Sequence, residues 1–413
     1  MSVVAAVRGF RPRSFNRNVR SFYLYGLSIN AGMTLYWLLY NLYLLRLSYQ
    51  EDFIGQVAGM APLATALLAL PTGVLSDRLG RRPFLIASGL LLALSQVGLC
   101  LSTASIDLLA FSFVGGVANA FIWVNHVPFL SDNAHPSRRA EAIVVWSAVQ
   151  IVVRMLLSLV GGFLPGAMAW FLGTSTEVPE PFRLALLLGA ACSLISVVPL
   201  LRIRGQPHAA PVQERGPDEG EDPRRPRGVF AVVAATAGMR GFSMGLTYPF
   251  FNVFFEEELH IGPAAIGAVF FLSHLVGLPF TFSVPALVRR FGATLTILAS
   301  RAASGGAVGI MGAFITLPVA LPMFLLARAG EVIDIPADQH FTTQVLPRRY
   351  WARVQSIRVC GFQLLAFLGS LAGGVLILEY GYLLVFGLAG LSRTASGLAM
   401  AAWFGMRSDR AAP

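Results

Sequence analysis

The sequence predicts an all-α integral membrane protein whose twelve transmembrane helices form two pseudo-symmetric six-helix bundles. Composition, the lengths of the apolar runs and an internal repeat each lead to this prediction. Of the 413 residues, 55% are hydrophobic and only 13% are charged, whereas about a quarter of the residues in a soluble domain are charged. This composition excludes a single compact soluble core.

The formal net charge is +10, and the sequence contains no lysine, so its strong bases are all arginines. The arginines gather in alternate connections between apolar runs, while the other connections carry acidic residues and few bases. Basic residues are enriched in the cytoplasmic connections of membrane proteins. We therefore expect a multi-pass protein of the cytoplasmic (inner) membrane of a prokaryote, with both termini in the cytoplasm. The same distribution excludes a nucleic-acid-binding module.

Twelve apolar runs are long enough to cross a bilayer, which takes about twenty residues in a helix. In the first half we expect helices at 21–45, 53–76, 83–102, 108–130, 142–164 and 182–201. In the second half we expect them at 229–255, 264–288, 293–316, 319–340, 354–378 and 382–404. The first run is too long for a signal peptide, so we expect an uncleaved helix. The cysteines Cys100, Cys192 and Cys360 lie inside apolar runs, which indicates small buried side chains.

The two halves are separated by residues 204–228, which are rich in Pro, Gly, Glu and Arg and have almost nothing to bury. We expect this segment to be a flexible cytoplasmic linker. The predicted domains are a cytoplasmic N-terminal tail (1–20), a first bundle (21–203), the linker (204–228), a second bundle (229–404) and a cytoplasmic C-terminal tail (405–413).

An internal repeat relates the halves at an offset of 212 positions. The residues that correspond are Ile54-Gly55 and Ile266-Gly267, Tyr36 and Tyr248, Gly80 and Gly292, and Ala140 and Ala352. One offset that serves several separated places is typical of a duplicated transporter fold.

The connection between the second and third runs has the pattern Gly-x-x-x-Asp-Arg-x-Gly-Arg-Arg. Its residues are Gly73, Asp77, Arg78, Gly80, Arg81 and Arg82. The pattern resembles the signature loop between helices 2 and 3 of the major facilitator superfamily of secondary transporters, with Leu79 where a third basic residue is often found. The resemblance covers essentially the whole chain outside the linker and tails, although only this loop is specific.

The resemblance implies that this loop is a cytoplasmic gate, in which the aspartate engages the other half of the protein in one conformation only. Gly73 and Gly80 allow the backbone to turn tightly. Asp132 and Arg139 resemble the Glu-x6-Arg pattern of sugar-porter members and are candidate partners of the loop. The alternative is that the arginines only anchor the loop at the lipid headgroups. The corresponding segment 285–292 lacks the first glycine and the aspartate, so we expect an asymmetric gate.

Ionisable side chains inside membrane spans are costly and are functional candidates. The run at 319–340 carries Arg328, Glu331, Asp334 and Asp338. At about 100° per residue, the three carboxylates lie within a roughly 60° arc of one helix. The resemblance implies that this helix lines the central cavity. These residues are therefore candidates for proton coupling or for binding a cationic solute.

Structural pairing is the alternative role for these acids. In that case Asp338 pairs only with Arg348 or Arg349, and Glu331 pairs only with Arg328 or Arg358.

Arg154 and Arg240 lie on helices that line the cavity in related proteins, so the resemblance implies that they bind an anionic solute or neutralise the acids; structural pairing is again the alternative. Arg301 and Arg393 lie on helices that are usually peripheral, and we expect snorkelling or interhelical bonds there. The other cavity candidates are Asn30, Tyr36, Asn119, His126, Tyr248, Asn252 and His274. As a set they suit an amphipathic organic solute.

The sequence therefore predicts a secondary transporter that moves a small organic solute by alternating access, with proton-coupled export favoured. Proton-coupled uptake, or uniport, is the alternative. Two markers of drug–proton antiporters are missing, because Ser112 or a neighbour replaces the helix 4 arginine and Gly161-Gly162 replaces the helix 5 Gly-Pro motif. A non-transporting receptor or assembly protein on the same fold is the alternative from another class.

We expect no enzyme activity, cofactor or metal site, because the sequence contains no metal-binding motif, nucleophile elbow or phosphate-binding loop. The expected partners are the solute, protons and membrane lipids. We expect a monomer that binds no nucleic acid.

Overall fold

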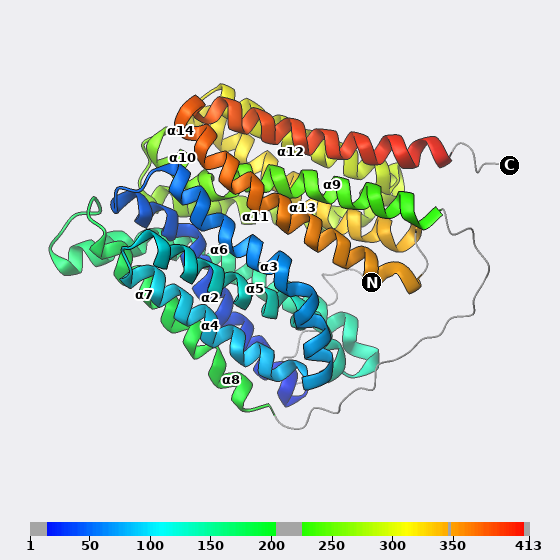
Figure 1. Cartoon of the computed structure of the whole chain (residues 1–413), viewed down its shortest axis with the longest axis horizontal. Coiled ribbons are helices and arrows are strands. Elements are labelled where there is room, and N and C mark those ends of the chain that lie inside the picture. The colour runs from blue at the N-terminus through cyan, green and yellow to red at the C-terminus, as the bar shows by residue number, and fades with distance from the viewer. Residues whose placement is uncertain (1–14, 204–224, 346–347, 409–413) are drawn as a thin grey trace. The chain divides into compact units, whose positions relative to one another are not determined.

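The structure is a computed structural model that describes residues 15–203, 225–345 and 348–408. These ranges contain helices and no strands (Figure 1). Most of the predicted tails, 1–20 and 405–413, and of the predicted linker, 204–228, lies outside the described residues. The roles assigned to those segments stay predictions.

The chain divides into two compact units. The first consists of Met1–Ser48, Leu67–Gln213 and Gly262–Phe271, and the second of Tyr49–Ala66, Glu214–Ile261 and Leu272–Pro413. Two helices, α3 (Glu51–Leu79) and α11 (Pro263–Phe291), contribute to both units. The domain limits predicted from the sequence stay predictions.

The other helices belong to one unit each. Those of the first unit are α2 (Arg17–Arg46), α4 (Arg81–Leu101), α5 (Ser105–Asn133), η2 (Pro136–Arg138), α6 (Arg139–Leu172), α7 (Glu180–Ile195) and α8 (Val197–Leu201). Those of the second unit are α9 (Arg225–Thr247), η3 (Tyr248–Phe250), α10 (Phe251–Glu257), α12 (Ala293–Ala313), α13 (Leu317–Val345) and α14 (Arg348–Ser408).

Every predicted span overlaps one of these helices, and two of the predicted spans fall within α14. This helix covers 61 residues but contains a non-helical residue, Gly381, with φ 73° and ψ 179°. Among the described helices, eight are long and apolar enough to cross a membrane, and α13 with its charged residues is not one of them. The chain is thus an all-α membrane protein, and the number of twelve spans stays a prediction.

Two glycines at the offset of 212 positions begin helices in the same way. Gly80 precedes α4 with φ 85° and ψ 157°, and Gly292 precedes α12 with φ 79° and ψ 158°. Residues with a side chain rarely adopt such a positive φ, which glycine tolerates. The repeat in the sequence therefore corresponds to a repeated backbone conformation.

The repeat also appears in the packing of the first turns of α3 and α11. In the first unit, a Cβ atom built on Gly267 of α11 would lie 2.7 Å from the Cα atom of Gly162 on α6. In the second unit, a Cβ atom on Gly55 of α3 would lie 3.2 Å from the Cα atom of Gly374 on α14. Gly162 and Gly374 are themselves 212 positions apart. Both units therefore use the same close glycine-to-glycine contact.

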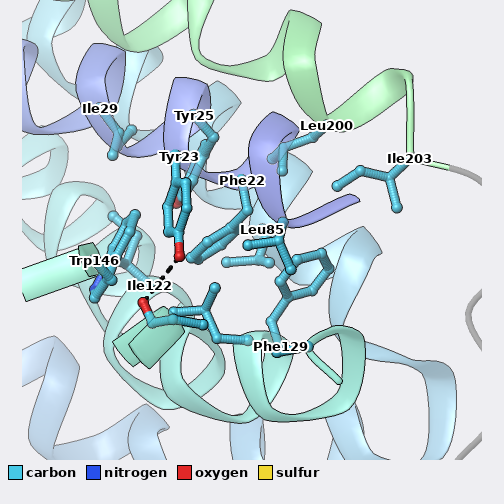
Figure 2. Packing of buried hydrophobic residues seen from close by; sticks show 14 of the residues in the cluster. Phe22, Tyr23, Tyr25, Ile29, Leu85, Ile122, Phe129, Trp146, Leu200 and Ile203 are labelled. Carbon is cyan, nitrogen blue, oxygen red and sulfur yellow. Dashed lines mark hydrogen bonds between the residues drawn. The ribbon is translucent and has the colours of Figure 1, made fainter. Parts of the chain in front are cut away.

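An aromatic cluster in the first unit fixes α2, α5 and α6 against one another (Figure 2). The ring centroid of Phe22 lies 4.7 Å from that of Phe129 and 4.6 Å from that of Trp146. The Tyr23 hydroxyl donates to the carbonyl oxygen of Ala142 at 3.1 Å. Aromatic pairs at such distances contribute about 0.5–1.5 kcal/mol each beyond their burial. The cluster holds Trp146 in position, and this side chain also lines the cavity described below.

Candidate functional site

Nine side chains of the second unit form two neighbouring polar groups along α13, which together we call the α13 network. Its members are Arg240 on α9, Tyr248 on η3, Arg301 on α12, Arg328, Glu331, Asp334 and Asp338 on α13, and Arg358 and Arg393 on α14. The four α13 residues follow one another at spacings of three or four, which places them along one side of the helix.

The inner part of the α13 network centres on two buried carboxylates, Asp334 and Asp338. Asp334 Oδ1 lies 2.8 Å from Arg301 Nε, and Asp334 Oδ2 lies 3.3 Å from Arg240 Nε. Asp338 Oδ2 lies 3.1 Å from Arg240 Nη1 and 3.5 Å from Arg301 Nη2, and it also contacts Arg358. Arg240 and Arg301 therefore bridge the two carboxylates.

The outer part centres on Glu331. Arg393 Nη1 lies 2.7 Å from Glu331 Oε1 and donates to Ser304 Oγ at 2.6 Å. Arg328 and the hydroxyl of Tyr248 both contact Glu331 Oε2, and they also contact each other. Tyr248 is 38% exposed, so this part of the network is accessible, unlike the buried inner part.

Arg301 and Arg393, for which the sequence left snorkelling and interhelical bonding open, are both buried in the structure. Only 1% of Arg301 and 4% of Arg393 is exposed. Both form ion pairs with carboxylates of α13. Interhelical bonding is therefore the observed arrangement, and snorkelling does not occur for these two residues.

The observed ion pairs of Glu331 and Asp338 agree only in part with the structural pairs that the sequence analysis gave as the alternative. Glu331 contacts Arg328, as that alternative states, but it also contacts Arg393. Arg358 contacts Asp338 rather than Glu331. The side chains of Arg348 and Arg349 lie outside the described residues.

The first unit contains a cavity between α2, α5 and α6. Its lining residues are Asn30, Met33, Ile122, Trp123, His126, Trp146, Gln150 and Arg154. This lining contains two indole rings, one imidazole and one guanidinium group, and no carboxylate. Its empty volume of about 250 Å³ is smaller than the roughly 300–1,000 Å³ of most small-molecule sites.

Arg154 is the charged group of this cavity. Its Nη2 atom donates to Gln150 Oε1 at 3.2 Å and to Asn30 Oδ1 at 3.4 Å. Its guanidinium group lies 5.5 Å from the ring centroid of Trp37. The structure thus brings three predicted cavity residues together: Asn30, His126 and Arg154.

Four other predicted cavity residues lie outside both sites. Tyr36 stacks on Tyr40 within α2, with ring centroids 4.6 Å apart. Asn119 lies in α5, where its Oδ1 atom is buried without a hydrogen-bond partner among the described residues. Asn252 is buried in α10, and His274 lies in α11.

Sequence reasoning missed the tryptophans and Gln150 of the cavity, although a signal for them exists. Trp146, Gln150 and Arg154 follow one another at spacings of four, which predicts one stripe along α6. On α2, Asn30, Met33 and Trp37 likewise recur at spacings of three and four. The polar residue of each stripe was a candidate, and its aromatic neighbours belong to the same face.

The predicted gate lies in the first unit, where α3 ends and α4 begins. Arg81 bridges two carboxylates: its Nε atom lies 2.7 Å from Asp132 Oδ2, and its Nη2 atom lies 3.3 Å from Asp77 Oδ1. Arg82 donates to the carbonyl oxygens of Leu200 and Leu201 at 3.1 and 3.0 Å. These carbonyls end α8, where a positive charge complements the helix dipole.

Two of the gate candidates lack such contacts. Arg78 and Arg139 are exposed and form no ion pair with the described residues. Arg138 pairs instead with Glu141, three residues along the chain, at 2.6 Å. This hydrogen bond raises the pKa of Arg138. A Cβ atom on Gly73 would have no neighbour closer than 3.8 Å, so close packing does not require glycine there.

Replacing Asp132 by asparagine is expected to lower the free energy of unfolding by about 1 kcal/mol or less, because partly exposed ion pairs contribute little. Thermal unfolding of the purified protein in detergent measures this change. About 0.5 M salt should reduce the difference further by screening. A loss above about 3 kcal/mol would contradict the prediction, since such losses are typical of buried pairs.

Comparisons with known proteins agree with this architecture. The sequence profile of the Major Facilitator Superfamily matches residues 22–326. The uncharacterized MFS-type transporter YfkL of Bacillus subtilis (strain 168) is 36% identical over 93 residues, which cover 22% of this chain and 23% of that relative. The matched part is therefore less than a quarter of the relative's length.

Solved structures share the fold over nearly the whole chain. The nucleoside transporter NupG superposes with a TM-score of 0.72 at 15% identity, covering 94% of this chain and 99% of that one. A D-xylose-proton symporter superposes with a TM-score of 0.73 at 15% identity, covering 93% of this chain and 96% of that one. At such identities the likeness concerns the fold alone.

Proposed function

Because this chain belongs to the Major Facilitator Superfamily, we propose that it carries a small organic solute by alternating access and that protons drive the movement. Members of this family are transporters, so the chain is a multi-pass membrane transporter and not an enzyme. The nature of the solute, the coupling ion and the direction are proposals. So are the location in the cytoplasmic membrane of a prokaryote, the cytoplasmic termini and the monomeric state.

The observation that carries proton coupling is the α13 network. Burying an ion pair costs several kcal/mol of desolvation per ion. Replacing such a pair by apolar side chains of similar size often leaves the stability unchanged or raises it by about 1–4 kcal/mol. Stability alone therefore does not account for three carboxylates on one helix inside a membrane protein. Ionisable groups in such places commonly mark proton or substrate pathways.

Glu331 is the member of the network best suited to exchange a proton. Its two carboxylate oxygens meet Arg393 on one side and the accessible Arg328 and Tyr248 on the other. Asp334 and Asp338 are buried and bridged by arginines. We propose that Glu331 binds the transported proton while the two aspartates hold the neighbouring helices together.

The loop from Gly73 to Arg82 is proposed as the cytoplasmic gate, with the Arg81–Asp132 pair as its support. Arg81 fixes α4 to α5 and also contacts Asp77. Asp77 keeps 67% of its side chain exposed. It is therefore available to another group when the conformation changes.

Two directions of proton-coupled transport are compatible with this proposal. Export by exchange with protons is the direction that the sequence favours, and uptake together with protons is the alternative. Arginines outnumber carboxylates both in the α13 network and in the cavity lining, which favours uptake of an anion together with a proton.

Proton movement through Glu331 is testable in liposomes that contain the purified protein and a pH-sensitive dye. Cationic, anionic and neutral solutes are supplied as separate pools. The wild type is expected to move protons with one pool, and Glu331→Gln is expected to lose this movement because the amide cannot take up a proton. Glu331→Asp keeps the carboxyl group and should retain part of it.

Glu141→Gln is the matched control, because Glu141 pairs with Arg138 outside the α13 network. It should leave proton movement unchanged. Solute movement without proton flux in the wild type would contradict proton coupling and indicate a uniporter. Proton flux in Glu331→Gln equal to that of the wild type would contradict the role of Glu331. No movement of any solute would favour the non-transporting alternative.

A further inference from the structure

The α13 network contains more positive than negative charge. Five guanidinium groups meet three carboxylates among its members, which leaves an excess of two positive charges. Unbalanced charge in the interior of a membrane protein is costly. A bound anion would lower this cost, whereas a bound cation would raise it.

The arrangement around Glu331 shows where an anion would bind. Arg393 and Arg328 hold opposite oxygens of this carboxylate. The guanidinium group of Arg328 also lies 4.9 Å from the ring centroid of Tyr248, which is the exposed member of the network. An anionic group entering beside Tyr248 would meet the same donors that now bind Glu331.

Charged and titratable groups lie on several of the elements around Glu331. On its own helix these are Arg328 and, one turn further, Asp334; η3 supplies Tyr248 and α14 supplies Arg393. Helix α12 contributes Arg301, which binds Asp334, and α9 contributes Arg240. Helix α11 packs against α13 where a Cβ atom on Gly277 would lie 3.3 Å from Val332, and His274 lies one turn before Gly277. Arginines dominate this environment.

Protonation of Glu331 forms an O–H bond on one carboxylate oxygen and removes the negative charge that holds Arg393 and Arg328. Both guanidinium groups then become available to an anion. A bound anion in turn makes protonation of Glu331 more favourable, because thermodynamic coupling between two ligands is reciprocal. A proton and an anion therefore bind together in this arrangement and do not compete.

The lining of the small cavity in the first unit has the same chemical character. Its lining combines Arg154 with the indole rings of Trp123 and Trp146 and lacks a carboxylate. Arg154 is bonded to the side-chain amides of Asn30 and Gln150. An anionic oxygen is a stronger acceptor than an amide oxygen. The aromatic lining suits an apolar body attached to the anionic group.

We infer that the solute is an organic anion with an aromatic or apolar body, and that it crosses the membrane in the same direction as a proton carried by Glu331. This inference rests on the proposed transport function.

The test uses three solute pools with the same aromatic bodies and different charges. The anionic pool contains benzenesulfonate and naphthalenesulfonate, the neutral pool contains the corresponding sulfonamides, and the cationic pool contains phenyltrimethylammonium and naphthyltrimethylammonium. Each pool is added outside liposomes that hold the full chain and an internal pH dye. The sulfonate pool is expected to acidify the interior of wild-type liposomes, and the other pools are not.

Variants separate the proton from the anion. Glu331→Gln should still take up sulfonate, measured by absorbance, but without acidification. Arg393→Gln and the more accessible Arg328→Gln should slow sulfonate uptake by about thirtyfold or more, which is typical of truncating one partner of a hydrogen-bonded charge pair. Arg290→Gln is the matched control, because Arg290 is exposed at the end of α11 and contacts Phe291; its rate should equal the wild-type rate.

Movement of the ammonium pool alone, movement of the sulfonamides alone, or alkalinisation by sulfonates would overturn this inference and leave the proposed transport function standing. No movement of any pool would count against both. Equal sulfonate uptake in Arg393→Gln, Arg328→Gln and the wild type would exclude the α13 network as the anion site.

Discussion

Asp334→Asn is expected to lower the free energy of unfolding by about 3–5 kcal/mol, the usual effect of removing one partner from a buried ion pair. Asp334 is 5% exposed and binds Arg301 and Arg240 through different oxygens. The amide keeps the shape of the side chain but cannot balance either guanidinium group. Denaturation of the purified protein in detergent, followed by tryptophan fluorescence, measures the change.

Arg240→Gln is the comparison that makes this prediction specific. It also breaks contacts to Asp334 and Asp338, but Arg301 continues to bind both carboxylates and Arg358 continues to bind Asp338. We expect a smaller loss of roughly 1.5–3 kcal/mol, the scale of hydrogen bonds to charged groups. A larger loss for Arg240→Gln than for Asp334→Asn would contradict the excess of positive charge in the network.

The double variant tests the interaction directly. If Arg240 and Asp334 stabilise each other, their combined substitution should cost about 0.5–3 kcal/mol less than the sum of the two single substitutions. Strict additivity would show that these residues act independently despite their 3.3 Å separation.

The all-α membrane fold was predictable because the bilayer leaves few alternatives. A long apolar run in hydrocarbon must satisfy its own backbone hydrogen bonds, and a helix does this within one segment. The internal repeat at an offset of 212 positions could also be recognised in the sequence. Gly80 and Gly292 show that the repeat corresponds to a shared backbone conformation. The close contacts of Gly55 and Gly267 were not predictable, because they depend on which helices meet.

The partners of α13 could not be identified from the sequence for a similar reason. Helical periodicity places Glu331, Asp334 and Asp338 on one side of their helix. Which arginines reach them depends on the rotation and spacing of α9, α12 and α14, which no local pattern encodes. Charge balance was the available signal: three carboxylates inside a membrane protein require cationic partners, and Arg301 and Arg393 were among the few candidates.

In the gate, matching residues to the family motif by their spacing alone identified one ion pair correctly and missed another. Arg81 and Asp132 do meet, because α4 and α5 pack side by side. Arg139 matches the family pattern by spacing, yet Arg138 forms the ion pair, since Glu141 lies three residues beyond it. A shift of one residue at a helix start changes the direction of a side chain by about 100°.

Gly162→Leu is expected to separate α6 from the first turns of α11. Gly162 meets Gly267 with so little space that a Cβ atom on Gly162 would lie 2.9 Å from Gly267 Cα and 2.7 Å from the carbonyl oxygen of Pro263. Backbone atoms cannot move aside as a flexible side chain can, and overpacking typically costs about 1–3 kcal/mol. Such a cost lowers the population of the packed arrangement by roughly five- to 150-fold.

Gly166→Leu is the matched control, because Gly166 lies one turn further along α6 with nothing within 4 Å of its Cβ position. The corresponding variant in the second unit is Gly374→Leu, because a Cβ atom on Gly374 would lie 2.9 Å from the backbone of Asp52. Gly387→Leu is its control.

Solute flux and the thermal unfolding temperature should fall for Gly162→Leu and Gly374→Leu and stay near wild type for the controls. Because the two contacts are repeats of one another, an effect of only one substitution would mean that the units do not contribute equally to the transport cycle. If Gly162→Leu keeps wild-type flux and stability, as Gly166→Leu is expected to, then the close packing of α6 and α11 is unnecessary for transport.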